Sequence, residues 1–452
     1  MYACLSHCWG TSGPTLKLDK KTYTRFTDGM LIDRLPKTFA DAANLCARLG
    51  LRFIWIDACC IMQDDNDDWK EAAATMATIY EQAHLTIAAI WAGNSDRGLF
   101  ASDRERYKAK RLKDHELYIL ECSDDFPLPD STKRYGFPLL RRAWAYQERV
   151  LSSRMVHFGK DQVGHQCPLL PETYNLQLPK RYRNSVELFM GQQILLFATI
   201  EDPVDRWHKV ETMYSGLELT YSCDRLPAIA AIVEREIRIR PDDIYIAGMW
   251  KNSLLPDLAW TSGDGQVQAW CPQIRYPTWA WPSSQAQVLW FSGPLEPSLR
   301  LVDLSYAHVG PAHVGQVTNA SITLEGHVLT VWFKKSLEKC PWNLVYCMEI
   351  VPRSLPDIET CFAYMDFDWA TGDRPVTIGD SLVIVPITLL SQGSDWPHYS
   401  GLILRKVTDG VFERIGIVDI QAIGCSEMTT MQSTQIICDY VEALPIRQVK
   451  II

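Results

Sequence analysis

The chain has 452 residues, and because single domains usually hold about 100 to 200 residues, we expect two or three compact units. Hydrophobic residues make up 47% and charged residues 22%, a globular balance that excludes an intrinsically disordered chain. The formal charge is -9, from 54 acidic and 45 basic side chains, so no domain-wide positive field can neutralise phosphates. We therefore expect no nucleic-acid partner.

The first third of the chain alternates strand and helix patterns. Short apolar runs predict three buried strands, and apolar residues at helical spacing predict the two helices between them. Asp67 or Asp68 is the candidate N-cap of the second helix. In chain order, the five predicted elements are residues 2–6, 38–49, 52–57, 67–83 and 85–90. This order predicts an α/β fold whose open, mostly parallel sheet is covered by helices on both faces.

Later elements are less regular. A strand at 116–122, a helix at 138–152 with Pro138 in its first turn, and a strand at 154–159 follow. The pattern from 184 to 239 is helical, and the next stretch, 250–294, is too rich in tryptophan to be a flexible linker.

After about residue 320 the apolar period changes to two, which predicts strands. We therefore predict three parts: an α/β domain at 1–165, a helical and Trp/Pro-rich segment at 166–295, and a β-rich domain at 296–452.

Membrane and secretory patterns are not found in the sequence. No apolar run approaches the ~18 residues of a spanning helix, and the N-terminus lacks the segments of a signal peptide. We expect a cytoplasmic protein without a membrane partner, whose 14 cysteines are mostly reduced core residues. No CxxC pair occurs, and Cys59 and Cys60 are adjacent, so we predict no metal site.

Chemistry-bearing residues follow two of the predicted strands. In an open parallel sheet, ligands bind beyond the carboxyl ends of the strands, so the segments after the first and second strands converge on one edge. Gly10 allows a tight turn there, and Trp9 offers a stacking surface. The residues expected at this crevice are Ser6, His7, Cys8, Trp9, Gly10, Asp57, Cys60, Gln63 and Asp64.

Several of these residues have a structural alternative. Asp57 can hold the turn that follows its strand, and Cys60 can be a core residue. Gln63 and Asp64 can belong to an ordinary polar loop. His7 can act as a base for Cys8 or Ser6, but neighbours on a strand point to opposite faces, so the pair meets only if the strand has already ended.

Three separated blocks resemble the fungal heterokaryon-incompatibility (HET) domain. They are YACLSHCWG, the long stretch LPKTFADAANLCARLGLRFIWIDACCIMQDDNDDWKEAAATMATIYEQAHLTIAA, and PLLRRAWAYQERVLSSRMVHFG. Their order and spacing follow the family pattern, with Ala72 where the family usually has Glu and WIDACC where WIDSLC is common. The resemblance implies an effector of fungal self/non-self recognition that leads to programmed cell death.

A further resemblance, in order and spacing more than in residue identity, is to TIR domains. Glu148 follows Trp144 by four residues, similar to the Trp-Cys-x-x-Glu helix whose Glu is catalytic in TIR domains that cleave NAD. The resemblance implies a TIR- or flavodoxin-like sheet, NAD as substrate, and Glu148 beside the ribose. Trp9 or Trp144 would hold the nicotinamide or adenine ring of NAD on its aromatic surface. Gln147, Arg142 and Arg149 are placed with the ligand-binding residues, the two arginines for the pyrophosphate.

Two other functions remain open. One is a small-molecule, secondary-metabolite biosynthetic enzyme with His7, Cys8, Asp57 and Glu148 as acid, base or nucleophile. The changes at Ala58, Cys59 and Ala72 and the lack of a recognisable sensor module favour it. The other is a non-catalytic signalling module that binds copies of itself. The expected partners are thus a small-molecule ligand and, for signalling, a homo-oligomer.

Overall fold

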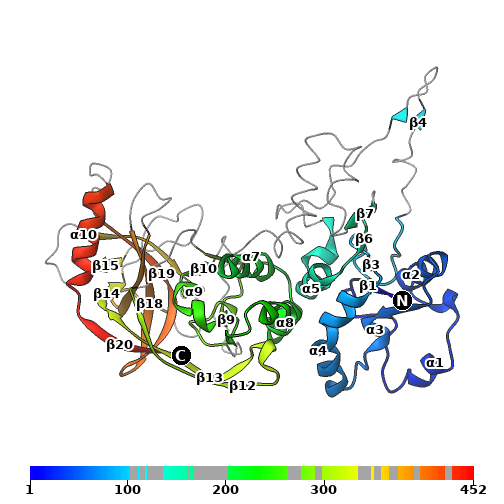
Figure 1. Cartoon of the computed structure of the whole chain (residues 1–452), viewed down its shortest axis with the longest axis horizontal. Helices are drawn as coiled ribbons and strands as arrows, with labels where there is room; N and C mark the ends of the chain where they lie inside the picture. The colour runs from blue at the N-terminus through cyan, green and yellow to red at the C-terminus, as the bar shows by residue number, and fades with distance from the viewer. Residues whose placement is uncertain are drawn as a thin grey trace. The chain divides into compact units, whose positions relative to one another are not determined.

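A computed structural model gives the fold of the chain (Figure 1). It describes residues 1–101, 110–111, 118–119, 136–160, 163–166, 202–262, 276–290, 298–333, 348–350, 358–365, 375–390, 398–422 and 430–452. The chain divides into two compact units. The N-terminal unit comprises residues 1–206 with 227–235, and the C-terminal unit comprises 207–226 with 236–452.

A five-stranded sheet forms the centre of the N-terminal unit. Its order is β2-β1-β3-β6-β7, in which β1, β2, β3 and β6 run parallel and β7 is antiparallel to β6. This order, with the first strand inside the sheet, is that of flavodoxin-like folds. The strands are β1 (Tyr2–Ser6), β2 (Phe53–Ile56), β3 (Leu85–Ala88), β6 (Met155–Phe158) and β7 (Val163–Gln166). The predicted α/β fold with a mostly parallel sheet is confirmed.

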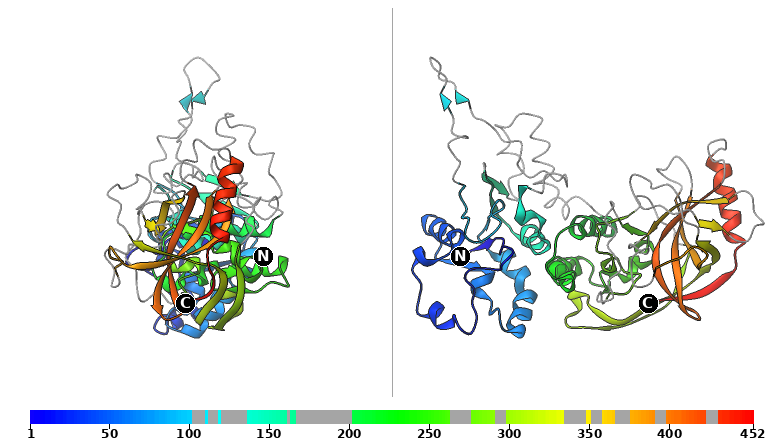
Figure 2. Two further views of the ribbon diagram at one scale, coloured as in Figure 1. Left: turned by 90° about the vertical axis from the view of Figure 1, so that its left-hand side faces the viewer. Right: turned by 180° about the vertical axis from the view of Figure 1, so that it is seen from behind.

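Helices cover both faces of this sheet because β1 alternates its side chains between two apolar clusters. Ala3 and Leu5 pack with Phe39 of α2, whereas Cys4 packs with Tyr80 of α4 and Leu151 of α5. Figures 1 and 2 show α2 on one side of the sheet and α4 and α5 on the other. The α-helices of this unit are α1 (Tyr23–Thr27), α2 (Lys37–Arg48), α3 (Asp57–Cys60), α4 (Asn66–Gln82) and α5 (Ala143–Leu151).

The prediction of a single helix at 138–152 is wrong in one respect, because two helices form there. A 3-10 helix at Pro138–Arg141 and α5 are separated by Arg142, whose backbone is extended (φ -81°, ψ 130°). Pro138 fits the first turn of the short helix, as predicted. The break turns Arg142 toward the loop after β1, where its guanidinium donates to the main-chain oxygen of His7 at 2.7 Å.

The N-cap of α4 also differs from the prediction. The cap is Asp65, whose carboxylate accepts hydrogen bonds from the backbone N–H groups of Asp67 and Asp68 at 3.0 and 3.3 Å. Asp65 is the last extended residue before the helix, so neither Asp67 nor Asp68 can take this position. Asp68 instead accepts a hydrogen bond from the N–H of Met62 at 2.6 Å.

Between residues 102 and 135 the structure describes only a short strand pair, β4 (Lys110–Arg111) with β5 (Tyr118–Ile119). The rest of the strand predicted at 116–122 lies outside the described residues. The same is true of residues 184–201 of the predicted helical region. Beyond them, α7 (Pro203–Ser215) and α8 (Ala230–Ile239) confirm the helical prediction.

Tryptophans fill the core of the helical part of the C-terminal unit. Trp207, Trp250, Trp260, Trp279 and Trp281 are fully buried, so the described part of the Trp-rich stretch is core, as expected, and not linker. Around them lie α9 (Leu254–Asp257) and the strand pairs β8 (Tyr245–Ile246) with β9 (Met249–Trp250) and β10 (Trp260–Ser262) with β11 (Val288–Trp290).

A larger sheet, with nine described strands, completes the C-terminal unit. Its order is β12-β13-β20-β19-β18-β17-β14-β15, with β16 paired to β19, and it is antiparallel except for β19 and β20. Helix α10 (Thr430–Glu442) packs on β18 and β19 (Figure 2). The strands are β12 (Arg300–His308), β13 (Val317–His327), β14 (Leu329–Phe333), β15 (Met348–Ile350), β16 (Ile358–Met365), β17 (Ser381–Leu390), β18 (His398–Thr408), β19 (Val411–Ala422) and β20 (Ile446–Ile451).

Candidate functional site

The position of β1 in the sheet determines where the candidate site lies. Strand β1 pairs with β2 on one side and with β3 on the other, so the strand order reverses at this point. Open α/β sheets bind ligands beyond the carboxyl ends of the strands at such a switch point. Ser6 ends β1, and Asp57 follows β2 at the same edge. The predicted convergence of the two segments on one edge is confirmed.

Glu148 is a buried carboxyl group at this edge. It lies on α5 with 7% of its surface exposed, and its carboxyl group accepts hydrogen bonds from the hydroxyls of Ser6 and Tyr80. Burial raises the pKa of Glu148 to about 7, and the negative charge of Asp57 acts in the same direction. The two hydroxyls and the cation of Arg142 oppose this rise. Glu148 therefore gains or loses its charge close to neutral pH.

Asp57 links the end of β2 to the loop after β1. Its Oδ2 accepts a hydrogen bond from Nε1 of Trp9 at 2.8 Å, and its Oδ1 accepts one from the N–H of Ala58 at 2.7 Å. The first contact fixes the indole, and the second holds the start of α3. The carboxylate thus has the turn-supporting contact expected of a structural residue while it keeps about a quarter of its side chain exposed, at 24%.

His7 lies on the α2 side of the sheet. Its ring meets Phe39 edge-on at 4.9 Å between centroids, and its Nδ1 is 3.7 Å from Oδ1 of Asp57. Burial lowers the pKa of His7, a change that Asp57 partly opposes, so the imidazole is neutral at pH 7. Neither ring nitrogen makes a hydrogen bond of normal geometry to a described residue.

Gly10 brings the loop after β1 close to the loop after β3. Its φ of +84° lies in the left-handed region, and a Cβ at this position would come within 2.9 Å of the Cβ of Asn94. The close approach requires glycine, since a side chain would meet both backbone strain and a steric clash. The predicted tight turn at Gly10 is confirmed.

Trp144 and Glu148 face the same neighbouring helix, as their spacing predicts. Trp144 meets Trp69 of α4 edge-on at 6.0 Å, and Glu148 reaches Tyr80 of the same helix. Arg149 is buried, with its guanidinium carbon 5.8 Å from the centre of the Tyr146 ring.

The remaining polar candidates make contacts within the protein. Gln147 is buried, and its Oε1 accepts a hydrogen bond from the N–H of Ala231 at 3.3 Å. Gln63 donates through Nε2 to the main-chain oxygens of Asp57 and Ile61, at 3.2 and 3.0 Å. Asp64 accepts from the N–H of Lys20 through both carboxylate oxygens at 3.2 Å. These contacts hold the loops around the site.

The two cysteine candidates lie in different surroundings. Cys8 is buried in an apolar cluster with Ile90 and Met155, away from the cluster that His7 contacts through Phe39, so the structure does not pair them as nucleophile and base. Cys60 is exposed, and the expectation that it is a core residue is wrong. In the short helix α3 it is Ala58 that packs in the core, and Cys60 follows about 200° further around the helix.

Tyr80 belongs to the site but was not among the sequence candidates. It shares the apolar face of α4 with Met76, so its spacing indicates only a core position. The signal available in the sequence was its hydroxyl, because a buried tyrosine usually finds a hydrogen-bond partner.

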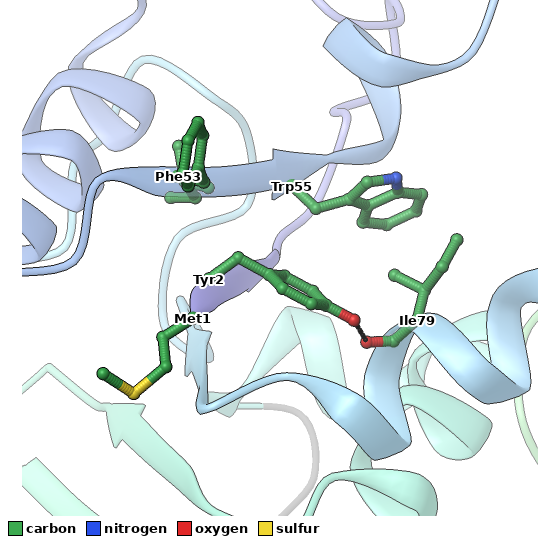
Figure 3. A pocket seen from close by; sticks show the side chains of 6 residues that line it. Met1, Tyr2, Phe53, Trp55 and Ile79 are labelled. Atoms are coloured by element: carbon green, nitrogen blue, oxygen red, sulfur yellow. Dashed lines mark hydrogen bonds between the residues drawn. The ribbon is translucent and has the colours of Figure 1, made fainter.

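A shallow apolar pocket lies elsewhere on the N-terminal unit, at the starts of β1 and β2 (Figure 3). It measures about 440 Å³ and is lined by Met1, Tyr2, Phe53, Ile54, Trp55 and Ile79. The hydroxyl of Tyr2 donates to the main-chain oxygen of Ile79 at 2.6 Å. Because this pocket is at the opposite ends of the strands and is lined by no carboxyl, imidazole or guanidinium side chain, it is not the candidate site.

The described residues contain neither a metal-binding cluster nor a membrane-spanning helix. No group of three or more His, Cys, Asp or Glu side chains there is arranged to hold a metal ion. In the same part of the chain, no helix combines the length and apolar character needed to cross a bilayer.

Comparison with known proteins gives one match. Residues 2–148 match the family model described as heterokaryon incompatibility protein (HET), a range that begins at β1 and ends at Glu148. No curated protein and no solved structure matches the chain. Residues 2–148, about a third of the chain, are therefore similar to the heterokaryon-incompatibility (HET) family.

Proposed function

We propose that the N-terminal unit hydrolyses the bond between nicotinamide and ribose in NAD, and that this activity makes the protein an effector of cell death. The observation that carries the proposal is the carboxyl group of Glu148, which lies at the switch point of the sheet, changes charge near pH 7, and is surrounded by Ser6, Asp57 and Arg142. Perturbed carboxyl groups at such positions are typical of active sites.

The proposed reaction consumes one water molecule and releases nicotinamide, ADP-ribose and a proton. As the C1′–N bond breaks, its electron pair passes to the nicotinamide ring nitrogen and the ribose develops positive charge. The charged form of Glu148 stabilises that charge and orients the ribose hydroxyls. His7 is neutral and can accept the proton of the attacking water.

Two further groups suit the rest of the dinucleotide. Arg142, whose backbone is extended just before α5, can hold the pyrophosphate by charge-assisted hydrogen bonds. Trp9, fixed by Asp57 at the same edge, offers a ring face for nicotinamide or adenine.

The test is turnover of NAD and NADP by the purified full chain, with products identified by mass spectrometry. Glu148→Gln keeps the shape of the side chain and removes its charge, so nicotinamide release should stop. Glu71→Gln, on the exposed surface of α4, is the matched control and should act as the wild type does. The proposal fails if a folded wild-type protein releases no nicotinamide, or if Glu148→Gln releases it at the wild-type rate.

A non-catalytic signalling module is the second candidate function. The observation that favours it is that four polar site residues already form hydrogen bonds with other parts of the protein: Asp57, Asp64 and Gln147 as acceptors and Gln63 as a donor. In that case the site holds loops in place, the wild type does not turn over NAD, and Glu148→Gln changes stability alone.

Expression in a fungal host separates a cell-death effector from a biosynthetic enzyme. Induction of the wild-type chain should arrest growth and deplete cellular NAD, and Glu148→Gln at equal abundance should do neither. Normal growth with unchanged NAD, together with a new small-molecule product in the culture, would favour the biosynthetic enzyme instead.

A further inference from the structure

Three elements meet at the carboxyl group of Glu148. Ser6 reaches it from the end of β1, and Tyr80 reaches it from α4, while Glu148 itself lies on α5. A carboxylate accepts hydrogen bonds and donates none, so both hydroxyls must act as donors to its charged form. One donor lies at the end of β1 and the other lies on α4, and together they restrict rotation of the carboxylate.

Packing holds Tyr80 in place as a donor. Its side chain is almost fully buried, and its ring meets Trp55 of β2 edge-on at 5.6 Å. Burial, together with the nearby charge of Glu148, raises the pKa of Tyr80 well above its usual value, so its hydroxyl keeps its proton. Tyr80 is therefore a neutral donor throughout the pH range in which Glu148 titrates.

We propose that Tyr80 is a positioning residue for Glu148: the Tyr80 hydroxyl, with that of Ser6, holds the Glu148 carboxyl group in one orientation. The catalytic consequence rests on the proposed NAD hydrolysis. The effect on the carboxyl group itself does not, and it can be measured without turnover.

The other groups that face Glu148 do not change charge with Tyr80. The Cys4 thiol of β1 is neutral because burial raises its pKa, with the charge of Glu148 acting in the same direction. Asp57 of α3 and Arg142 before α5 supply one negative and one positive charge. Removal of the Tyr80 hydroxyl leaves these charges in place, so a change in the titration of Glu148 can be assigned to the lost hydrogen bond.

The experiment is a pH titration of the Glu148 carboxyl group in the full chain, by NMR of protein labelled with ¹³C at glutamate carboxyl carbons. The signal is assigned by its loss in Glu148→Gln. Tyr80→Phe should raise the proton affinity of Glu148 about tenfold, because a donor to the charged form is lost. Nicotinamide release at pH 7 should fall about fivefold, because the charged fraction of Glu148 falls from about a half to about a tenth, and it should recover as the pH is raised.

Tyr2→Phe is the matched control. It removes a hydroxyl on the same face of the sheet that also bonds to α4, through the main-chain oxygen of Ile79, and it does not touch Glu148. The titration of Glu148 should be unchanged in this variant.

A second variant covers the case in which Tyr80→Phe folds poorly. Replacement of Tyr80 by 3-fluorotyrosine keeps the ring and makes the hydroxyl a stronger donor, so it should lower the proton affinity of Glu148. An unchanged titration in both folded Tyr80 variants would overturn the proposal. A shifted titration in a chain that releases no nicotinamide would support the positioning role and overturn the NAD proposal.

Discussion

Each compact unit buries a glutamate with a raised pKa, Glu148 in the N-terminal unit and Glu211 in the C-terminal unit. Glu148 sits where strands end and loops begin, with two hydroxyl donors that keep its pKa near 7. Glu211 lies on α7 beside the indoles of Trp207 and Trp281, with Asp257 and Arg240 within electrostatic reach. Burial dominates there and raises its pKa well above the usual value, which favours the protonated form of Glu211.

The difference shows how the position of a buried carboxyl group limits what it can do. At a sheet edge, polar donors and nearby loops keep the charged form accessible, which suits chemistry on a ligand. Inside an aromatic core the neutral acid is favoured, and the residue behaves as a polar core group. Four experiments test this contrast, in order of decreasing expected effect.

The largest effect is expected on turnover. Glu148→Gln should lower nicotinamide release by about 100-fold or more, because an electrostatic contact made in the transition state is lost. Glu211→Gln changes a carboxyl group in the core of the other unit and should change the rate by less than about twofold. Nicotinamide release by both variants is measured at saturating NAD. Equal losses of nicotinamide release in the two variants would show that Glu148 and Glu211 do not differ in their importance for turnover.

The second effect is on the pH dependence of stability. The pKa of Glu148 rises from 4.5 to about 7 on folding, so the folded state holds the proton more tightly. The stabilisation is present below about pH 4.5 and is lost as the pH rises through about 7. Relative to Glu148→Gln, the wild type should lose about 3 kcal/mol of unfolding free energy over this range, measured by urea denaturation.

The same comparison for Glu211 should have the same sign. Because burial raises the pKa of Glu211 on folding, the wild type should lose stability relative to Glu211→Gln as the pH rises above the unfolded pKa of 4.5. A stability difference that does not change with pH would show that folding does not raise the pKa of Glu211.

The third effect tests how far the N-terminal site depends on loop geometry. Gly10→Ala should cost about 2 to 3 kcal/mol, because it combines a left-handed backbone with a contact of 2.9 Å to Asn94. Gly13→Ala is the control, since φ there is also positive but no atom lies within 4 Å, and it should cost about 1 kcal/mol. Thermal unfolding measures both; equal costs would mean that Asn94 moves aside.

The smallest effect concerns the polar groups near Glu211. Ser253 donates to Oδ2 of Asp257 at 2.7 Å, while His208 is 2.7 Å from the other oxygen. Ser253→Ala should cost about 1 to 2 kcal/mol and leave turnover unchanged. Ser283→Ala removes a hydroxyl that bonds only to main-chain oxygens and should cost less. A loss of turnover in Ser253→Ala would give the C-terminal unit a part in the chemistry.

The sheet of the N-terminal unit could be predicted because its inner strands β1 and β3 are buried on both faces and the apolar runs of its strands are continuous. The edge at which Ser6 and Asp57 meet followed from the parallel arrangement alone. The break at Arg142 could not be predicted, since the contact made there is with His7, 135 positions away in the sequence.

Local sequence patterns also gave no correct assignment at two places on α4, its N-cap and Tyr80. Asp64 and Asp65 precede α4 and Asp67 and Asp68 lie in its first turn, and only the backbone conformation shows that Asp65 is the cap. Tyr80 lies in an apolar stripe, so its bond to Glu148 is visible only once α4 and α5 are packed together. In the C-terminal unit β12 was not predicted, because it is largely exposed and lacks a clean alternation of apolar and polar residues.

The bond between Ser6 and Glu148 joins residues 142 positions apart, which has a consequence for biosynthesis. As the chain leaves the ribosome, β1 can pair with β2 and β3 once the first 90 residues are available. At that stage Ser6 and Tyr80 exist without the carboxyl group that joins them. The site is therefore completed only after α5 has been synthesised. A prematurely released chain that ends before Glu148 would contain Ser6 and Tyr80 but lack the carboxyl group that they bind.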